Sequence, residues 1–432
     1  MSGLREYDSK DFFSDESFVG DPYPYFDALR EESPVRREPH HGVMLVTGYD
    51  EAAQVAQDAD TWSSCISVTG PFPGFPVPLD GDDVSDLIAE HRDKLPMNDQ
   101  LPVLDPPEHT KHRALMMKLI TPKRLKENED EMAGVADRLL DEFLAKGAGE
   151  FISQFAAPFS LHVIADLLGV PDEDRAEFVA ALQRRPQEQT TLGQIKSELA
   201  HSPMEFLYLK FTGYINERRA EPRQDVLTGM ATATFPDGST PEVMDVVRIA
   251  ANVFSAGQET TVRLLSSALL IIAENPDIQA RLRAEPALIP NFIEETLRTE
   301  SPIKGDFRLA RKTTEVGGVE IKAGTMAMIL NGAANRDPRH FEDANTFDLE
   351  RKNARHHMAF GRGIHTCPGA PLARAEARTC IERILAKTTD IRLSEQAHGP
   401  KDDRRFMYLP TYILRGLAFL GLEFDVVEAD AR

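Results

Sequence analysis

The chain has 432 residues, of which 41% are hydrophobic, so it can bury a sizeable core in one large domain or in two or three smaller ones. Its net charge of −21 argues against general nucleic-acid binding and is most simply read as a charge that favours solubility. Three widely spaced cysteines offer no disulfide framework and favour a reducing cytoplasm. The N-terminus lacks the apolar run of a signal peptide, and the longest apolar stretch, 264–273, is too short to span a bilayer.

Helical periodicity dominates the chain, and strand-like segments are few. Candidate helices lie near 22–32, 50–57, 82–94, 107–120, 123–146, 152–168, 172–184, 202–220, 241–275, 276–284, 290–299 and 371–387. The helix-rich parts are about 82–300 and 371–387, and the β-rich parts are about 35–48 and 307–330, where "EVGGVEI" predicts a hairpin. With no linker or repeat, we expect a single domain over 1–432, mainly α with small β-sheets.

Two early regions depart from this regular pattern. Residues 68–107 carry too many prolines for regular structure, and long irregular segments often form lids or binding loops. Phe72 and Phe75 either line an apolar pocket there or pin the segment to the core. From 109 to 126 the chain carries only basic charges, which indicate either a docking patch for an acidic partner or a solvated helix face.

The clearest helix begins near Pro241, with Thr240 as the expected N-cap, and ends before Pro276. Its middle contains Gly257, which costs about 1 kcal/mol relative to Ala inside a helix. The hydroxyl of Thr260 can bond back to the carbonyl four residues earlier and bend the helix. Together with Glu259 it could form a proton-delivery pair, although a packing notch of small residues is the simpler interpretation.

A carboxylate and a guanidinium, Glu295 and Arg298, stand three residues apart on a short predicted helix and should face each other. Exposed pairs of this kind are common and add little, so the spacing alone is a weak signal.

Cys367 lies in a Gly/Pro-rich loop just before a predicted helix, and three chemistries could use it. A nucleophile would need an oriented base and a third member, and a zinc site would need a second Cys/His pair; neither is evident. A haem iron needs one strong protein ligand and an open opposite face. The glycines Gly361, Gly363 and Gly369 allow close approach to a flat ligand, and a helix start stabilises a thiolate, so the third use fits best.

The stretch Phe360–Gly369 reads F-G-R-G-I-H-T-C-P-G and resembles the haem-binding signature of the cytochrome P450 family. Glu295–Arg298 is similar to the family's E-x-x-R pair, and 347–351 to the segment that supplies a second arginine. Residues 256–261 resemble its oxygen-binding motif, and "HTKHR" (109–113) the helix motif that holds haem propionates. The resemblance covers nearly the whole chain.

The resemblance implies a triangular helical domain with a long central helix over haem b. It implies Cys367 as the axial iron ligand and Thr260 with Glu259 as the catalytic proton donors. The buried structural network would consist of Glu295, Arg298 and Arg351. The propionates would be held by His109, Arg113, Arg308 and His365, and the other cofactor contacts would be Ala256, Gly257, Phe360, Gly361 and Gly369.

The implied activity is that of a monooxygenase of bacterial type, which inserts one oxygen atom of O₂ into a C–H bond of a hydrophobic small molecule such as a terpenoid, steroid or aromatic compound. Electrons would come from a separate ferredoxin, with ferredoxin reductase and NAD(P)H upstream. Its docking residues would be Lys111, Lys118, Lys123, Arg124, Arg362 and Arg374. We expect a cytoplasmic monomer that binds neither membrane nor nucleic acid.

Two other functions remain open from the sequence. A haem-thiolate protein could bind only a gas or ligand, but it would not need the Glu259–Thr260 pair; a Cys/His hydrolase would leave the propionate cations unexplained. The expected pocket lining is 66–104, 177–215, 252–257, 303–307 and 409–414. Lys304 could anchor a substrate carboxylate there, although a lysine that points to solvent is the simpler expectation.

Overall fold

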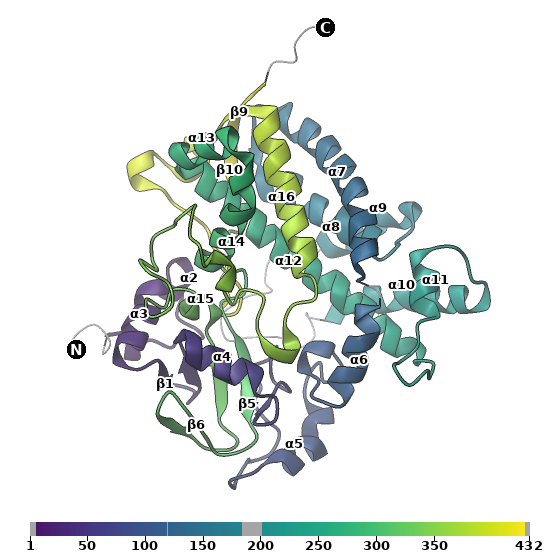
Figure 1. The fold of residues 1–432 in the computed structure, drawn as a ribbon, viewed down its shortest axis with the longest axis vertical. Helices are drawn as coiled ribbons and strands as arrows, with labels where there is room; N and C mark the ends of the chain where they lie inside the picture. The colour runs from purple at the N-terminus through teal and green to yellow at the C-terminus, as the bar shows by residue number, and fades with distance from the viewer. Residues whose placement is uncertain (1–5, 119, 184–200, 428–432) are drawn as a thin grey trace.

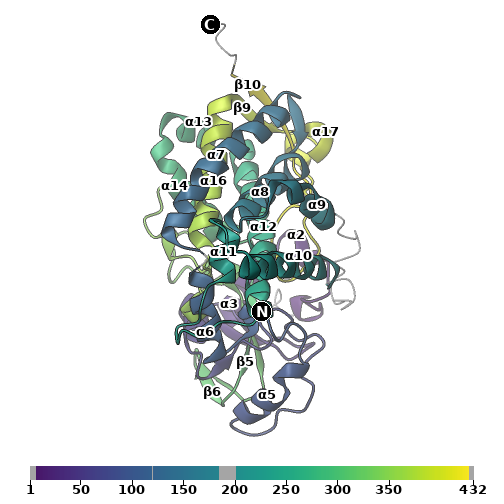
Figure 2. The same cartoon turned by 90° about the vertical axis from the view of Figure 1, so that its right-hand side faces the viewer.

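The computed structural model describes residues 6–118, 120–183 and 201–427. Figure 1 shows a broadly triangular outline, with a helical part at the top and right and a β-rich part at the lower left. Seen from the side in Figure 2, the helical part stands above the strands β5 and β6. The expectation of a mainly α fold with small β-sheets is confirmed.

The helices follow the periodicity closely. In the described residues they are α2 (Ser17–Gly20), α3 (Tyr23–Glu32), α4 (Tyr49–Gln57), α5 (Ser85–His91), α6 (Glu108–Met117), α7 (Pro122–Leu144), α8 (Ala157–Leu167), α9 (Asp172–Gln183), α10 (His201–Ala220), α11 (Val226–Ala231), α12 (Val243–Glu274), α13 (Pro276–Ala284), α14 (Ile289–Thr299), α15 (Asn331–Ala334), α16 (Ala370–Lys387) and α17 (Glu395–His398). A π-helical turn, Ile152–Ala156, precedes α8. The short helices α2, α11, α15 and α17 have too few residues for a periodic signal, which is why the sequence did not indicate them.

The strands form three small sheets. They are β1 (Val35–Arg37), β2 (Met44–Val46), β3 (Trp62–Ser63), β4 (Ala148–Glu150), β5 (Asp306–Ala310), β6 (Thr314–Val316), β7 (Val319–Ile321), β8 (Met326–Ile329), β9 (Thr388–Leu393) and β10 (Gly421–Val426). The largest sheet has the order β1-β2-β8-β5-β3, with β2 and β8 parallel and the other pairs antiparallel. The predicted hairpin is β6–β7, and both of its glycines have positive φ. The sheet β4-β10-β9 was not expected.

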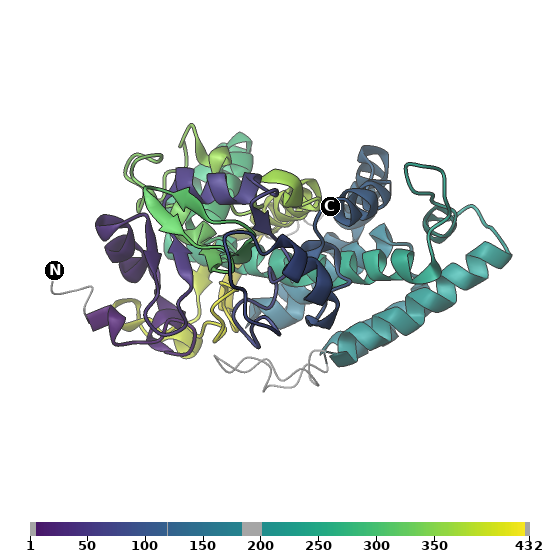
Figure 3. The ribbon, with the colours of Figure 1, turned by 90° about the horizontal axis from the view of Figure 1, so that it is seen from below.

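The central helix α12 runs through the helical part for 32 residues, or roughly 48 Å at about 1.5 Å per residue. The predicted cap at Thr240 is wrong, because the helix begins at Val243. Glu242 and Asp245 instead form a reciprocal capping box, in which each side chain accepts a backbone N–H of the other. Helix α10 packs alongside α12, as Figure 3 shows from below.

The buried residues of α12 anchor the main core. Phe254 is fully buried, with its ring centroid 5.1 Å from that of Phe178 on α9 and 6.3 Å from that of Phe211 on α10. Helix α16 packs against both α7 and α12, so the segment that precedes α16 is delivered to the middle of the molecule. Among the described residues, no helix is both long and apolar enough to cross a bilayer.

Candidate active site

The loop before α16 is a tight backbone hairpin that ends at Cys367. The N–H of Cys367 donates to the carbonyl of Phe360 at 2.8 Å, and Gly361 and Gly363 both adopt positive φ. A side chain at Gly363 would bring its Cβ within 2.3 Å of the carbonyl oxygen of Ala56 on α4. Glycine is therefore required there, because the loop rests directly on the backbone of the β-rich part.

The sulfur of Cys367 lies at the N-terminus of α16, where the backbone N–H groups of Gly369 and Ala370 donate to it. Burial raises the pKa of the Cys367 thiol, while these N–H groups and the guanidinium of Arg113 act in the opposite direction. The arrangement leaves a sulfur that stays protonated until a positive centre draws the proton off, as a metal ion does. The thiol Cys380 on α16 is fully buried in the core, as its position on the helix indicated.

Two imidazoles from distant parts of the chain meet beside this loop. The ring centroids of His109 on α6 and His365 lie 4.2 Å apart. Both nitrogens of His109 and Nε2 of His365 are buried, and within the described residues none of them has a hydrogen-bond partner. Burial lowers the pKa of His109 to about 4 and that of His365 to about 2. The positive charge of Arg113 acts in the same direction on both rings, and that of Arg308 acts in the same direction on His365.

Buried imidazole nitrogens without partners are costly, so the site is built for acceptors that a ligand brings. Arg308 on β5 is only 4% exposed, and burial lowers the pKa of Arg113 on α6. Two carboxylates carried by one flat ligand would give the imidazoles their missing acceptors. They would also pair with Arg113 and Arg308, which donate to the carbonyls of Thr366 and Phe307 in this structure. A haem, with two propionates and a need for one strong axial ligand, fits these residues together with the Cys367 sulfur.

The middle of α12 shows one accessible face inside an otherwise buried helix. Residues 252–260 are largely half-buried and Ala256 is exposed, whereas 261–269 are buried throughout. Within this stretch Gly257 is closely packed, because a side chain there would place its Cβ 3.1 Å from Ile164 on α8. This part of α12 is therefore covered less completely by side chains of the described residues than 261–269.

The acid and the alcohol of this segment have different partners. Thr260 donates its hydroxyl to the carbonyl of Ala256 at 2.9 Å, the back-bond that the sequence predicted. The helix stays continuous in spite of it. Glu259 forms an ion pair with Arg263 at 3.1 Å, and Arg263 also donates to the carbonyl of Leu417.

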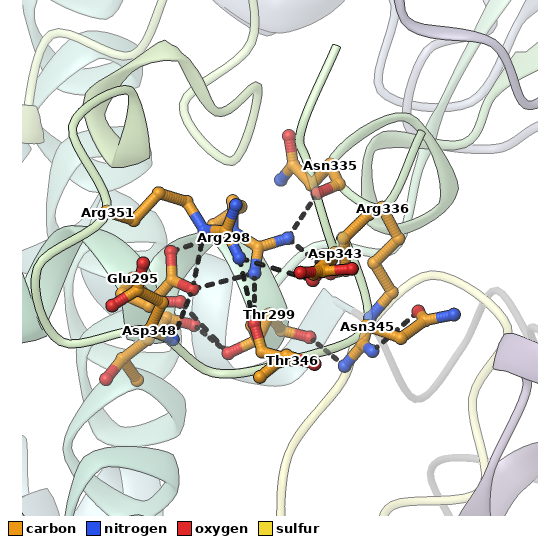
Figure 4. A network of polar contacts seen from close by, with 12 residues as sticks. Glu295, Arg298, Thr299, Asn335, Arg336, Asp343, Asn345, Thr346, Asp348 and Arg351 are labelled. Atoms are coloured by element: carbon orange, nitrogen blue, oxygen red, sulfur yellow. Dashed lines mark hydrogen bonds and ion pairs between the residues drawn. The ribbon is translucent and has the colours of Figure 1, made fainter. Parts of the chain in front are cut away.

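The pair Glu295 and Arg298 is fully buried and lies at the centre of a polar network (Figure 4). Nε and one terminal nitrogen of Arg298 contact the two oxygens of Glu295 at 2.8 and 2.7 Å. The other guanidinium hydrogens go to the carbonyls of Asn335, Ala344 and Thr346. All five N–H donors of Arg298 therefore have acceptors.

Arg351 completes this network from the segment that resembled the source of a second arginine. Its Nε donates to Glu295 at 2.9 Å, and its terminal nitrogens reach carbonyls of residues 342, 343 and 346. The backbone N–H of Asp348 also donates to Glu295. The network thus holds the irregular segment 335–351 against α14 by its backbone.

The basic residues between 109 and 126 are largely engaged within the molecule. Lys118 donates to Thr234, Arg124 donates to backbone carbonyls of 166 and 167, and Lys111 lies over the ring of Phe235. A separate groove of about 310 Å³ lies over the cysteine loop and is lined by three arginines. These are Arg355, Arg362 and Arg374, of which Arg355 was not expected.

The expectation for Lys304 is wrong, because the residue is only 4% exposed. Its Nζ donates to the carbonyl of Thr411 at 2.5 Å, and burial lowers its pKa to about 7. Phe72 packs against the rings of Phe13 and Tyr412 in the core of the β-rich part. Of the expected pocket lining, residues 184–200 lie outside the described residues.

Sequence reasoning also missed Glu294 and His357. Glu294 is 3% exposed, and the imidazole of His357 is 3.0 Å from its carboxylate. The sequence feature that could have indicated Glu294 is the first of the two acids in "EETLR". Adjacent helix residues point to different faces, so a carboxylate next to a buried one can bind a different neighbouring element.

Comparison with known proteins gives consistent results. The model of the family described as cytochrome P450 matches residues 213–406. Cytochrome P450 144 of Mycobacterium tuberculosis is 34% identical over 402 residues, which cover 90% of this chain and 87% of that protein. The 6-deoxyerythronolide B hydroxylase of Saccharopolyspora erythraea is 30% identical over 95% of this chain and 98% of that protein. The substrate-free structure of CYP150A6, a cytochrome P450 of Mycobacterium marinum, is 53% identical, covers 98% of this chain and 100% of its own, and has a TM-score of 0.92.

We predict that Arg298→Lys destabilises the protein by about 3–5 kcal/mol, because lysine has three donors and leaves part of the Glu295 carboxylate uncompensated in the core. Urea unfolding followed by circular dichroism measures the change. The matched control is Arg281→Lys, whose guanidinium pairs with Glu350 at an exposed site and should change stability by less than about 0.5 kcal/mol. Equal effects of the two substitutions would contradict the role assigned to the buried network.

Proposed function

The chain belongs to the cytochrome P450 family, and we propose that it hydroxylates a hydrophobic small molecule with electrons from a separate ferredoxin. It is a haem b monooxygenase of bacterial type. The observation that carries the proposal is the Cys367 sulfur at the start of α16, in one site with buried imidazoles that lack acceptors. The name of one relative, a hydroxylase, supports hydroxylation as the reaction.

We infer that Cys367 is the axial ligand of the iron and that the propionates complete the hydrogen bonding of His109 and His365, with Arg113 and Arg308 adding charge. Haem b, when bound, supplies the iron at which O₂ is activated with two electrons and two protons. The N–H groups of Gly369 and Ala370 limit how much electron density the sulfur donates.

The proton path that we propose runs along the accessible face of α12. The hydroxyl of Thr260 donates its hydrogen bond to the carbonyl of Ala256. Its oxygen is therefore free to accept a hydrogen bond from a water molecule and to hold that water in place. Arg263 fixes the carboxylate of Glu259 one residue away. That carboxylate accepts a proton from solvent and then passes it to the water, which returns Glu259 to its ionised form. Both groups belong to one helical turn, which keeps their separation constant.

The substrate pocket that we propose is apolar, which is why we favour a terpenoid, a steroid or an aromatic compound. Its floor is the half-buried part of α12, 252–260, where the apolar side chains of Val253 and Ala256 are partly accessible. Burial lowers the pKa of Lys304 to about 7, so this lysine can be neutral near neutral pH. It therefore does not require a negatively charged group on the substrate.

We predict that the purified protein binds haem and that its reduced CO complex has the red-shifted Soret band of a thiolate ligand. Cys367→Ala should remove that band, because Cys367 is the one cysteine in the loop sequence 358–369. The other two cysteines offer matched controls: Cys65→Ala and Cys380→Ala should keep the band, since both thiols are buried in cores. A colourless protein, or an unchanged band in Cys367→Ala, would refute the proposed function.

For Thr260→Ala we expect normal substrate binding but several times less product per NAD(P)H consumed, because the positioned water is lost and reduced oxygen leaves as peroxide. Product, peroxide and cofactor consumption measured together give the coupling. Thr260→Ser retains the hydroxyl and should restore most of it. Full coupling in the alanine variant would show that Thr260 takes no part in proton delivery.

We propose that the ferredoxin docks over the groove above the cysteine loop rather than on the whole basic run 109–126. The groove borders Phe360 and Thr366 on both sides of the loop, and its arginines suit an acidic partner. Of the residues in the basic run, Lys123 remains mostly exposed, with 86% of its side chain accessible, and could extend the contact.

We therefore expect Arg355→Glu to weaken ferredoxin binding at least several-fold at low salt, with the difference shrinking as salt rises. Arg355 is a suitable target because 73% of its side chain is exposed. Arg281→Glu on α13 makes the same charge change on a helix that does not line the groove and should leave the Kd unchanged. Equal weakening by both variants would mean that only overall charge matters.

A further inference from the structure

A second buried carboxylate, Glu294, stands beside Glu295 on α14 but serves the opposite neighbour. Successive helix residues point about 100° apart, so Glu295 faces the segment 335–351 while Glu294 faces the cysteine loop and α16. Glu294 is 3% exposed, and hydrogen bonds from His357 and Arg374, together with the charge of Arg374, lower its pKa to about 2 in spite of burial. It is therefore an ionised group inside the protein and must be matched by donors.

One donor is His357, and the structure defines its tautomer. The backbone N–H of Ala359 donates to Nδ1 of His357 at 3.1 Å, so Nδ1 is the acceptor. Nε2 must then carry the proton that it donates to Glu294 at 3.0 Å. Burial lowers the pKa of His357, which keeps the ring neutral. Glu294 thus holds, through one imidazole, the backbone immediately before Phe360.

The second donor is Arg374 on α16, seven residues after Cys367. Its Nε and one terminal nitrogen contact the two oxygens of Glu294 at 2.6 and 2.9 Å, a bidentate pair. The same guanidinium lies over the ring of Phe360, 4.7 Å from its centroid. The ring of His357 lies 5.7 Å from that of Phe360. Phe360 is therefore in contact with two side chains that both bind Glu294.

Glu294 can influence the Cys367 sulfur in two ways, through the position of Phe360 and through the charge of Arg374. The carbonyl of Phe360 accepts the N–H of Cys367 at 2.8 Å, so the position of Phe360 determines the position of the cysteine backbone. Arg374 also lies near the start of α16 and lines the groove over the cysteine loop, so its charge acts on the electrostatic potential at the sulfur. Glu294 neutralises that charge at close range, and in a poorly solvated site such compensation is large.

We propose that Glu294 is a positioning residue for the axial sulfur: through His357 and Arg374 it holds Phe360, and by pairing with Arg374 it sets the electrostatic potential at Cys367. The inference rests on the proposed function, because it takes Cys367 as the haem ligand. It assigns Arg374 a role inside the protein, in addition to any contact with an electron donor. Arg355 also approaches Glu294, at 3.4 Å, but is mostly exposed and hence screened by water.

The test is the midpoint potential of the haem in the holoenzyme, measured by spectroelectrochemical titration. Glu294→Gln leaves the charge of Arg374 uncompensated near the sulfur and should shift the potential to more positive values. Arg374→Gln leaves the carboxylate uncompensated and should shift it to more negative values. In the double variant the two changes cancel, and the potential should return toward that of the wild type.

The opposite signs distinguish this role from a merely structural one. Loss of packing alone would move both single variants in the same direction or lower only their stability, and either result would overturn the inference. The exposed pair of Arg378 on α16 and Glu129 on α7, 3.4 Å apart, gives the matched control: Arg378→Gln and Glu129→Gln should leave the potential unchanged. If Glu294→Gln fails to bind haem, Arg374→Gln still decides the question, because its guanidinium is partly exposed.

The inference and the proposed function fail differently. A wild-type protein without the thiolate band would refute the function, whatever the variants do. A wild-type protein with that band, combined with single-variant potentials equal to its own, would overturn only the role of Glu294.

Discussion

A guanidinium can be buried without water only if every one of its N–H groups finds an acceptor, and Arg298 meets that condition entirely with Glu295 and backbone carbonyls. The requirement constrains the whole segment 335–351, which has little regular structure of its own. That segment leads directly to the cysteine loop, and the amide of Asn335 accepts the N–H of Met358 at 2.6 Å. A charge buried far from the chemistry thus fixes the path of the chain into the site.

The features predictable from the sequence are those in which neighbouring residues suffice. Helix α12 shows its period over many turns, and the loop around Cys367 carries its glycines and its cysteine in one short stretch. The back-bond from Thr260 to Ala256 is equally local. The sheet β4-β10-β9 could not be predicted, because β4 and β10 are about 270 residues apart and each strand is too short to give a clear alternating pattern.

The errors arose where tertiary contacts decide between local alternatives. Lys304 is followed by Gly305 and Asp306, a polar setting that suggests solvent, yet its Nζ finds a backbone carbonyl from the loop near 411. At the start of α12, Thr240 and Glu242 are both acceptable caps, and the reciprocal bonds with Asp245 favour the later one. The meeting of His109 with His365 was not among the errors, because the family resemblance assigned both residues to the same ligand. It depends on the packing of α6 against the loop, which neither motif shows alone.

Helix α14 presents successive carboxylates to two different neighbours, Glu294 to α16 and Glu295 to the segment 335–351. A helix bound in this way cannot rotate about its axis without losing a buried ion pair. A shift by one residue that put Glu294 in the place of Glu295 would put Ile293 in the place of Glu294 and leave Arg374 without its carboxylate. The two sets of contacts therefore fix the rotation of α14 about its axis, and they link the segment 335–351 to the helix that begins beside the sulfur.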